Sequence, residues 1–173
     1  RLAVIDSAHK NLTDLTTQVT TLRDVLSNKQ TRGAFGQARM EAIVQDGMPK
    51  GSYEFQFTLS NKTRPDCVVF LPDTRPLVID AKFPLEDYQR LQDAIENADA
   101  GAVEASRKAM ETFFKAEAKS IRDKYIEPPH TLDFAILFVP TEGLYAEAVS
   151  RPGLADALQR DFRVMLAGPM NLQ

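Results

Sequence analysis

Residues 64–71, RPDCVVFL, and residues 76–82, PLVIDAK, decide how this chain folds. Both runs are rich in apolar and β-branched residues, and the short PDTR segment between them has the composition of a turn. The two runs therefore predict a β-hairpin. In such a hairpin the start of the first strand lies beside the end of the second, so Asp66, Asp80 and Lys82 are expected to meet at one edge of a sheet.

These three side chains suit the hydrolysis of a phosphodiester. Carboxylates are the ligands that Mg²⁺ or Mn²⁺ prefers, which makes Asp66 and Asp80 candidate metal ligands. The cation would polarise the phosphate and lower the pKa of its bound water. Lys82, which faces the same side of the strand as Asp80, would position the attacking water and offset the developing charge. The alternative is a structural ion pair between Asp80 and Lys82 at the end of the sheet.

Pro65-Asp66, the residues that follow, and Asp80-Ala81-Lys82 resemble the PD-(D/E)xK nuclease signature. The surrounding segments are similar, in the same order, to those of the RmuC family of bacterial DNA recombination proteins. These segments are GAFGQARME (33–41), YEFQF (53–57), VIDAKFPL (78–85) and LFVPTE (137–142). The resemblance implies a restriction-endonuclease-like core that hydrolyses DNA as an endonuclease or exonuclease, with DNA as the partner and Mg²⁺ or Mn²⁺ as the cofactor.

A helix from Phe35 to Gln45 is expected to precede these strands. In nucleases of the implied fold, an acidic residue on the first helix often completes the metal site, so Glu41 is a candidate ligand. The relatives usually carry Gly-Glu where this chain has Gly36-Gln37. Gln37 can hydrogen-bond a metal-bound water or the phosphate, but it brings no negative charge. Glu41 can equally belong to a solvated helix surface.

Composition excludes several classes of site. The chain has 173 residues, 43% of them hydrophobic, enough for one domain with a buried core and an extension. A single cysteine excludes an internal disulfide, and two histidines exclude a histidine-rich metal site. A net charge of −3 excludes a uniformly basic surface but allows a local basic patch. No apolar run approaches the roughly 20 residues that span a bilayer, so we expect a cytoplasmic protein, anchored at the inner membrane only through a segment outside this chain.

Residues 1–31 show a different pattern from residues 32–173. Their apolar positions alternate in spacing between three and four, namely Ile5, Ala8, Leu12, Leu15, Val19, Leu22 and Leu26. This heptad pattern predicts a long helix at the end of a coiled coil that joins copies of the protein into a homo-oligomer. The alternative is an amphipathic helix packed on its own domain. Residues 32–173 are expected to form the nuclease-like domain, and the relatives continue beyond the point where this chain ends.

A basic stripe follows one side of a helix expected from Ala102 to Tyr125. It contains Lys108, Lys115, Lys119 and Arg122, while apolar residues line another side. Such a row can track a nucleic-acid backbone without reading bases, and Arg64 is a further candidate phosphate contact. The alternatives are an ordinary solvated helix face and, for Arg64, a charge that keeps a strand edge soluble.

The order of the expected elements predicts an α/β fold with a central mixed sheet flanked by helices. A buried strand is expected over residues 132–139, a helix capped by Thr141 over 142–150, a helix over 154–160 and a last strand over 162–167. The main alternative to a nuclease is a DNA-binding or scaffolding protein that keeps the nuclease fold, has weak or no catalytic activity, and assembles through the coiled coil.

Overall fold

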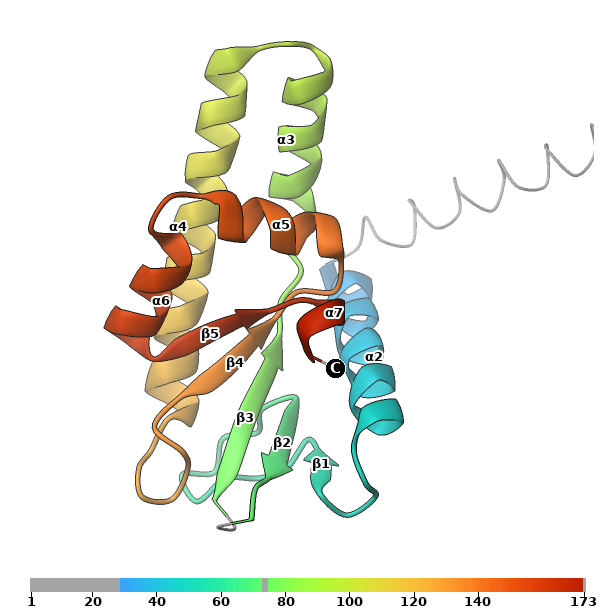
Figure 1. Ribbon diagram of the computed structural model, residues 1–173, viewed down its shortest axis with the longest axis vertical. Coiled ribbons are helices and arrows are strands. Elements are labelled where there is room, and N and C mark those ends of the chain that lie inside the picture. Colours follow the sequence, from blue (N-terminus) through green and yellow to red (C-terminus); the bar gives the residue numbers. More distant parts are fainter. Residues whose placement is uncertain (1–28, 73–74, 173) are drawn as a thin grey trace, which may run out of the picture.

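A mixed sheet of five strands runs through the centre of the molecule (Figure 1). The computed structural model describes residues 29–72 and 75–172. The strands lie in sequence order across the sheet. They are β1 (Tyr53–Phe55), β2 (Cys67–Phe70), β3 (Pro76–Ala81), β4 (Ala135–Phe138) and β5 (Val164–Ala167). The pairs β1–β2 and β2–β3 are antiparallel, whereas β3–β4 and β4–β5 are parallel.

Helices cover both faces of this sheet. They are α2 (Lys29–Gly47), α3 (Leu85–Glu96), α4 (Ala100–Tyr125), α5 (Glu142–Ser150), α6 (Leu154–Phe162) and α7 (Pro169–Leu172). Helix α2 lies on one side, and α4 and α6 lie on the other (Figure 1). Helix α3 and the first half of α4 form a hairpin that projects beyond the sheet (Figure 1). The parallel connections from β3 to β4 and from β4 to β5 run through helices, as parallel strands require.

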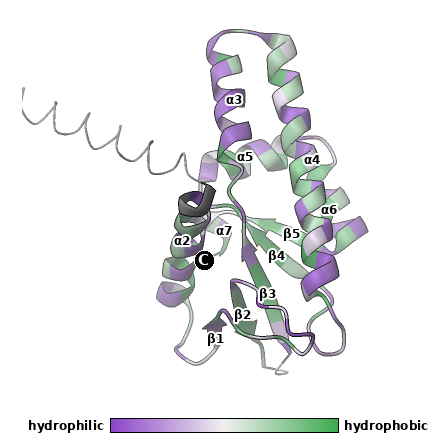
Figure 2. Cartoon of the chain, turned by 180° about the vertical axis from the view of Figure 1, so that it is seen from behind, coloured by the Kyte–Doolittle hydropathy of each residue, from purple (hydrophilic) through white to green (hydrophobic). Residues whose placement is uncertain are grey.

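The strands alternate their side chains between two hydrophobic clusters. Val68 and Val78 pack with Phe114 of α4 on one face, whereas Cys67 and Ile79 pack with α2 on the other. Each fully buried large side chain of this kind contributes about 1.5–3 kcal/mol through removal of apolar surface from water. Figure 2 shows the result, with hydrophobic strands at the centre and a largely hydrophilic α3. The alternation decides which residues beyond the strand ends share a face.

The central hairpin has the predicted arrangement, with Cys67 opposite Ile79 and Val68 opposite Val78. Strand β1 ends at Phe55, because Gln56, with φ of 54°, takes a left-handed conformation. Helix α2 begins at Lys29, not at Phe35, so the predicted start of this helix was wrong. Gly33 and Gly36 lie within α2 and do not interrupt it, because a glycine costs a helix only about 1 kcal/mol.

Two helix starts rest on side-chain caps. The Thr141 hydroxyl accepts a hydrogen bond from the backbone N–H of Leu144, which confirms the predicted cap of α5. Asp99 caps α4 in the same way, through the N–H of Ala102. None of the described helices is both long and apolar enough to cross a membrane. The coiled coil predicted for residues 1–31 lies outside the described residues, apart from its last three positions, which form the first turn of α2.

Candidate active site

Two aspartates occupy opposite positions where β2 begins and β3 ends. The ladder that pairs Cys67 with Ile79 places Asp66 opposite Asp80 in the next position, on the face covered by α4. The Asp66 Oδ2 atom also accepts a hydrogen bond of 2.9 Å from the backbone N–H of Ala81. The predicted convergence of the two carboxyl groups at one sheet edge is therefore present.

Asp80 is an unusual buried acid, with a residue exposure of only 4%. Burial raises the pKa of its carboxyl group to about 7, and the negative charge of Asp66 and a hydrogen bond with that residue act in the same direction. Lys82 opposes the increase. Two carboxyl groups so close together cannot both ionise freely near neutral pH, and a bound cation would relieve their repulsion.

Lys82 lies between two carboxylates. Its Nζ atom is 3.1 Å from Asp80 Oδ2 and 3.3 Å from Glu117 Oε2. Burial by itself would lower the pKa of Lys82, but the charges of Asp80 and Glu117 outweigh it and raise the pKa above its ordinary value. Its ammonium group is therefore fully charged at neutral pH and held at the sheet edge.

Two residues of this site were not among the predicted ones. Glu117 reaches Lys82 from α4, and Tyr125 lies near enough that Asp80 affects it electrostatically. The pKa of Tyr125 rises to about 12, mainly through burial and then through the charge of Asp80. A sequence signal for Glu117 existed, because it lies three residues after Phe114 and four before Ile121, within the buried stripe of α4. A lone carboxylate in an apolar stripe indicates a partner across the interface.

Gln37 and Glu41 lie on the helix that packs against the other face of the sheet. Both belong to α2, and the Gln37 amide donates a hydrogen bond of 3.3 Å to Glu41 Oε1. After burial, the charge of Glu41 is the largest cause that raises the pKa of the Cys67 thiol to about 12, so Glu41 lies near that residue. Cys67 is a buried residue of the α2-facing cluster. Within residues 29–72 and 75–172, no group of three or more acidic, histidine or cysteine side chains is arranged to hold a metal ion.

The basic stripe is divided by local contacts. Lys115 pairs with Glu111 at 3.1 Å, and Arg122 pairs with Asp123 and lies over the ring of Phe162. Lys108 and Lys119 are exposed. Arg64 donates two hydrogen bonds to the carbonyl of Gln56, which supports the end of β1. These hydrogen bonds favour the alternative role of Arg64, as a charged residue at the strand edge.

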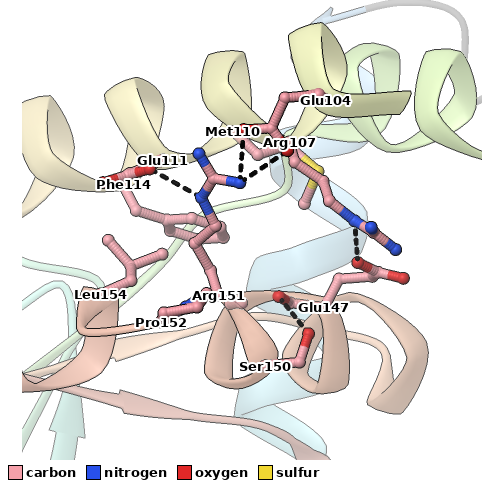
Figure 3. Close-up of a pocket in the computed structure, with 11 residues that line it drawn as sticks. Glu104, Arg107, Met110, Glu111, Phe114, Glu147, Ser150, Arg151, Pro152 and Leu154 are labelled. Atoms are coloured by element: carbon pink, nitrogen blue, oxygen red, sulfur yellow. Dashed lines mark hydrogen bonds and ion pairs between the residues drawn. The ribbon is translucent and has the colours of Figure 1, made fainter. Parts of the chain in front are cut away.

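A cavity of about 460 Å³ lies away from these aspartates, between α4 and the α5–α6 segment. Figure 3 shows Arg151 pointing from its wall toward Glu111 and Glu104, and Arg107 paired with Glu147. Its charged side chains are paired with one another, so they anchor α4 to the α5–α6 segment.

The donor set at the strand edge fits a hard divalent cation. Asp66 and Asp80 offer carboxylate oxygens side by side, and the pKa of Asp80 is raised by burial first and then by the charge of Asp66. Lys82 compensates part of this charge through its ion pair with Asp80.

Comparisons with known proteins give a consistent result. The family model of the RmuC family matches residues 1–173. A protein of Xylella fastidiosa (strain Temecula1) named "DNA recombination protein RmuC homolog" is 40% identical over 183 residues, covering 98% of this chain and 39% of that protein. Proteins with the same name are 32% identical in Chlamydia muridarum, over 87% of this chain and 35% of the relative, and 29% identical in Neisseria meningitidis serogroup A, over 97% and 31%. The chain thus spans about two fifths of the Xylella relative and less of the others, and no solved structure matches it.

Proposed function

The chain belongs to the RmuC family, and from this premise we propose that it acts in DNA recombination as a metal-dependent deoxyribonuclease that hydrolyses phosphodiester bonds. The observation that carries the proposal is the opposition of Asp66 and Asp80 beside the charged Lys82. The element order, one helix, three antiparallel strands, helices and a parallel strand, agrees with a restriction-endonuclease-like core.

In the proposed site, Asp66 and Asp80 hold Mg²⁺ or Mn²⁺ through carboxylate oxygens. When bound, the cation supplies Lewis-acid polarisation of the phosphate and a water of lowered pKa. The backbone N–H of Ala81 fixes the Asp66 carboxylate, so that ligand is oriented before any cation arrives. Lys82 positions the attacking water and stabilises the negative charge that develops on the phosphate oxygens. Glu41 and Gln37 stay candidates for contacts from the α2 side.

DNA contact is proposed for the exposed cations of α4 that remain accessible. Lys108 and Lys119 have no ion pair among the described residues, so their charges are available to phosphates. Lys115 and Arg122 would have to exchange their present partners for DNA, and Arg64 its hydrogen bonds to Gln56. Assembly into homo-oligomers through residues 1–31 and a cytoplasmic location, with or without an anchor outside this chain, complete the proposal.

The second candidate is a DNA-binding scaffold that retains the site without turnover. Gln37, which brings no negative charge, and the net charge of −3 favour it. An experiment separates the two. Cleavage of linear, branched and single-stranded DNA is measured with Mg²⁺ or Mn²⁺ for wild type, Asp80→Ala and Lys82→Ala, while DNA binding is followed in parallel.

Controls for this assay come from exposed residues of the same charge, Asp93→Asn on α3 and Lys124→Met at the end of α4. The longer Xylella relative is assayed beside this chain. Loss of cleavage in both site variants, with binding retained and both controls active, supports the nuclease. If this chain and the relative bind DNA but never cut it, the scaffold is the better description.

A further inference from the structure

We infer that Glu117 is a positioning residue of this site, which holds the Lys82 ammonium in place for the proposed reaction, on which this inference rests. The contact is direct, at 3.3 Å between Lys82 Nζ and Glu117 Oε2. It joins α4 to the end of β3, two elements that lie far apart in the sequence (Figure 1). Side-chain exposures of 32% for Lys82 and 28% for Glu117 place the pair at the border of the protein interior.

The environment of Glu117 explains why a carboxylate is placed there. Its neighbours along the helix, Phe114, Ala118 and Ile121, are all buried against the sheet. A carboxylate within such a stripe loses hydration and needs a charged partner, and Lys82 is that partner. Two other acidic residues of the helix, Glu104 and Glu111, are paired with Arg151 at the cavity wall (Figure 3). Glu117 is therefore separate from that network.

The charges of the site require a second partner for Lys82. Without a metal, the Asp80 carboxylate forms an ion pair with Lys82. As a metal ligand, the same carboxylate would also bind the cation. A lysine held only by Asp80 would then lie beside a divalent cation with weakened attraction and strong repulsion. Glu117 supplies an attraction that cation binding does not divert. With all four groups ionised, as a bound cation would favour, Asp66, Asp80, Glu117 and Lys82 carry a formal charge of −2, which one divalent cation neutralises.

The first test measures the amine of Lys82 directly, with neither metal nor DNA present. The complete chain is labelled with limiting acetic anhydride at pH 9, and acetylation of Lys82 is quantified by mass spectrometry relative to the exposed Lys108. In Glu117→Gln the Lys82 side chain loses the contact that holds its Nζ atom against α4, so the amine becomes more accessible to the reagent and labelling should rise by about 3-fold or more. Asp80, the other partner of Lys82, is unchanged in the variant.

The matched control is Glu104→Gln, which removes a carboxylate from the same helix, in contact with Arg151 and not with Lys82. Its Lys82 labelling should equal that of wild type. If Glu117→Gln folds with an unchanged circular dichroism spectrum and its Lys82 labelling also equals that of wild type, the inference is overturned. Where Glu117→Gln fails to fold, Glu117→Asp, whose shorter side chain keeps the charge, replaces it, and an unchanged Lys82 reactivity again overturns the inference.

The second test measures turnover of DNA. Because partners that orient a functional group typically contribute about 10–100-fold, kcat should fall by that factor in Glu117→Gln with KM for DNA unchanged, and Glu117→Asp should recover part of it. A normal kcat together with altered Lys82 labelling would overturn the positioning role. If wild type does not cleave DNA at all, the proposed nuclease fails, and the labelling experiment still decides whether Glu117 holds Lys82.

Discussion

Replacing Asp80 with asparagine should make the stability of this protein less dependent on pH. Asp80 is almost fully buried, and its pKa rises from 3.8 to about 7, through burial first and then the charge of Asp66. An acid whose pKa is raised on folding stabilises the folded state only while it is protonated there. Its contribution is complete below pH 3.8 and is lost as the pH rises through about 7.

The size of this loss follows from the two pKa values. One pKa unit corresponds to about 1.4 kcal/mol, so the whole difference between 3.8 and about 7 is worth about 4 kcal/mol. Between pH 5 and pH 8, Asp80 should lower the free energy of unfolding of wild type by about 3 kcal/mol. Asparagine does not titrate, so this loss is absent from Asp80→Asn. The raised pKa of Lys82 contributes equally at pH 5 and pH 8, because that group stays protonated in both the folded and the unfolded chain, and it cancels from the comparison.

Urea denaturation at pH 5 and pH 8, in EDTA, measures the effect. Wild type should lose about 3 kcal/mol more than Asp80→Asn between these two conditions. Asp93→Asn, which removes an exposed carboxylate from α3, should follow wild type. Parallel pH dependences of wild type and Asp80→Asn would refute the argument that Asp80 is buried beside a second carboxylate.

The same variant also tests the metal site. A cation present at 100 times its dissociation constant stabilises a folded protein by about 2.7 kcal/mol. At pH 8, saturating Mg²⁺ should therefore raise the free energy of unfolding of wild type by a comparable amount. The free energy of unfolding of Asp80→Asn should stay almost unchanged. Equal stabilisation of both proteins would contradict the assignment of Asp80 as a ligand.

Three further predictions concern packing, capping and DNA contact. Phe138→Ala removes a fully buried ring from the α2-facing core and should lower the free energy of unfolding by about 3–5 kcal/mol in urea, whereas a loss below 1 kcal/mol would contradict its position. Asp99→Ala removes the cap of α4 and should lower the free energy of unfolding, measured by thermal melts, by about 1 kcal/mol. Asp99→Asn keeps a side-chain oxygen that can accept the same hydrogen bond, so its loss should be much smaller. The double variant Lys108→Ala/Lys119→Ala should weaken DNA binding and reduce the slope of log affinity against log salt concentration by about 2. The control Lys50→Ala should change neither the affinity nor the slope. An unchanged slope in the double variant would exclude both lysines as phosphate contacts.

Much of the fold could be predicted because its signals are local. The apolar runs on either side of residues 72–75 specify a hairpin, and the hairpin register alone places Asp66 opposite Asp80. The cap at Thr141 needs only a residue with the right hydroxyl before a helix. The start of α2 was missed because the penalty of a glycine in a helix is small compared with the packing of Met40 and Val44 on the sheet.

The periodicity of the sequence predicted only those site residues that lie on the strands of the hairpin. A period of two along β3 correctly placed Asp80 and Lys82 on one side of the sheet. The face occupied by Gln37 and Glu41 depends on how α2 packs, and no sequence period states which side of the sheet a helix covers. The structure places Glu41 near Cys67, on the helix that packs against the face of the sheet opposite α4.

The sequence by itself determined the family, the mixed α/β class and the opposition of two aspartates in one hairpin, because each follows from short segments whose geometry is fixed by nearest neighbours. Only the tertiary structure decided that α4 crosses the end of β3 and brings Glu117 to Lys82. The residues of that ion pair are 35 positions apart, and their contact depends on the packing of Phe114 and Ile121 against the sheet. Packing of this kind sums many weak contacts from distant segments, so no single stretch of the chain encodes it.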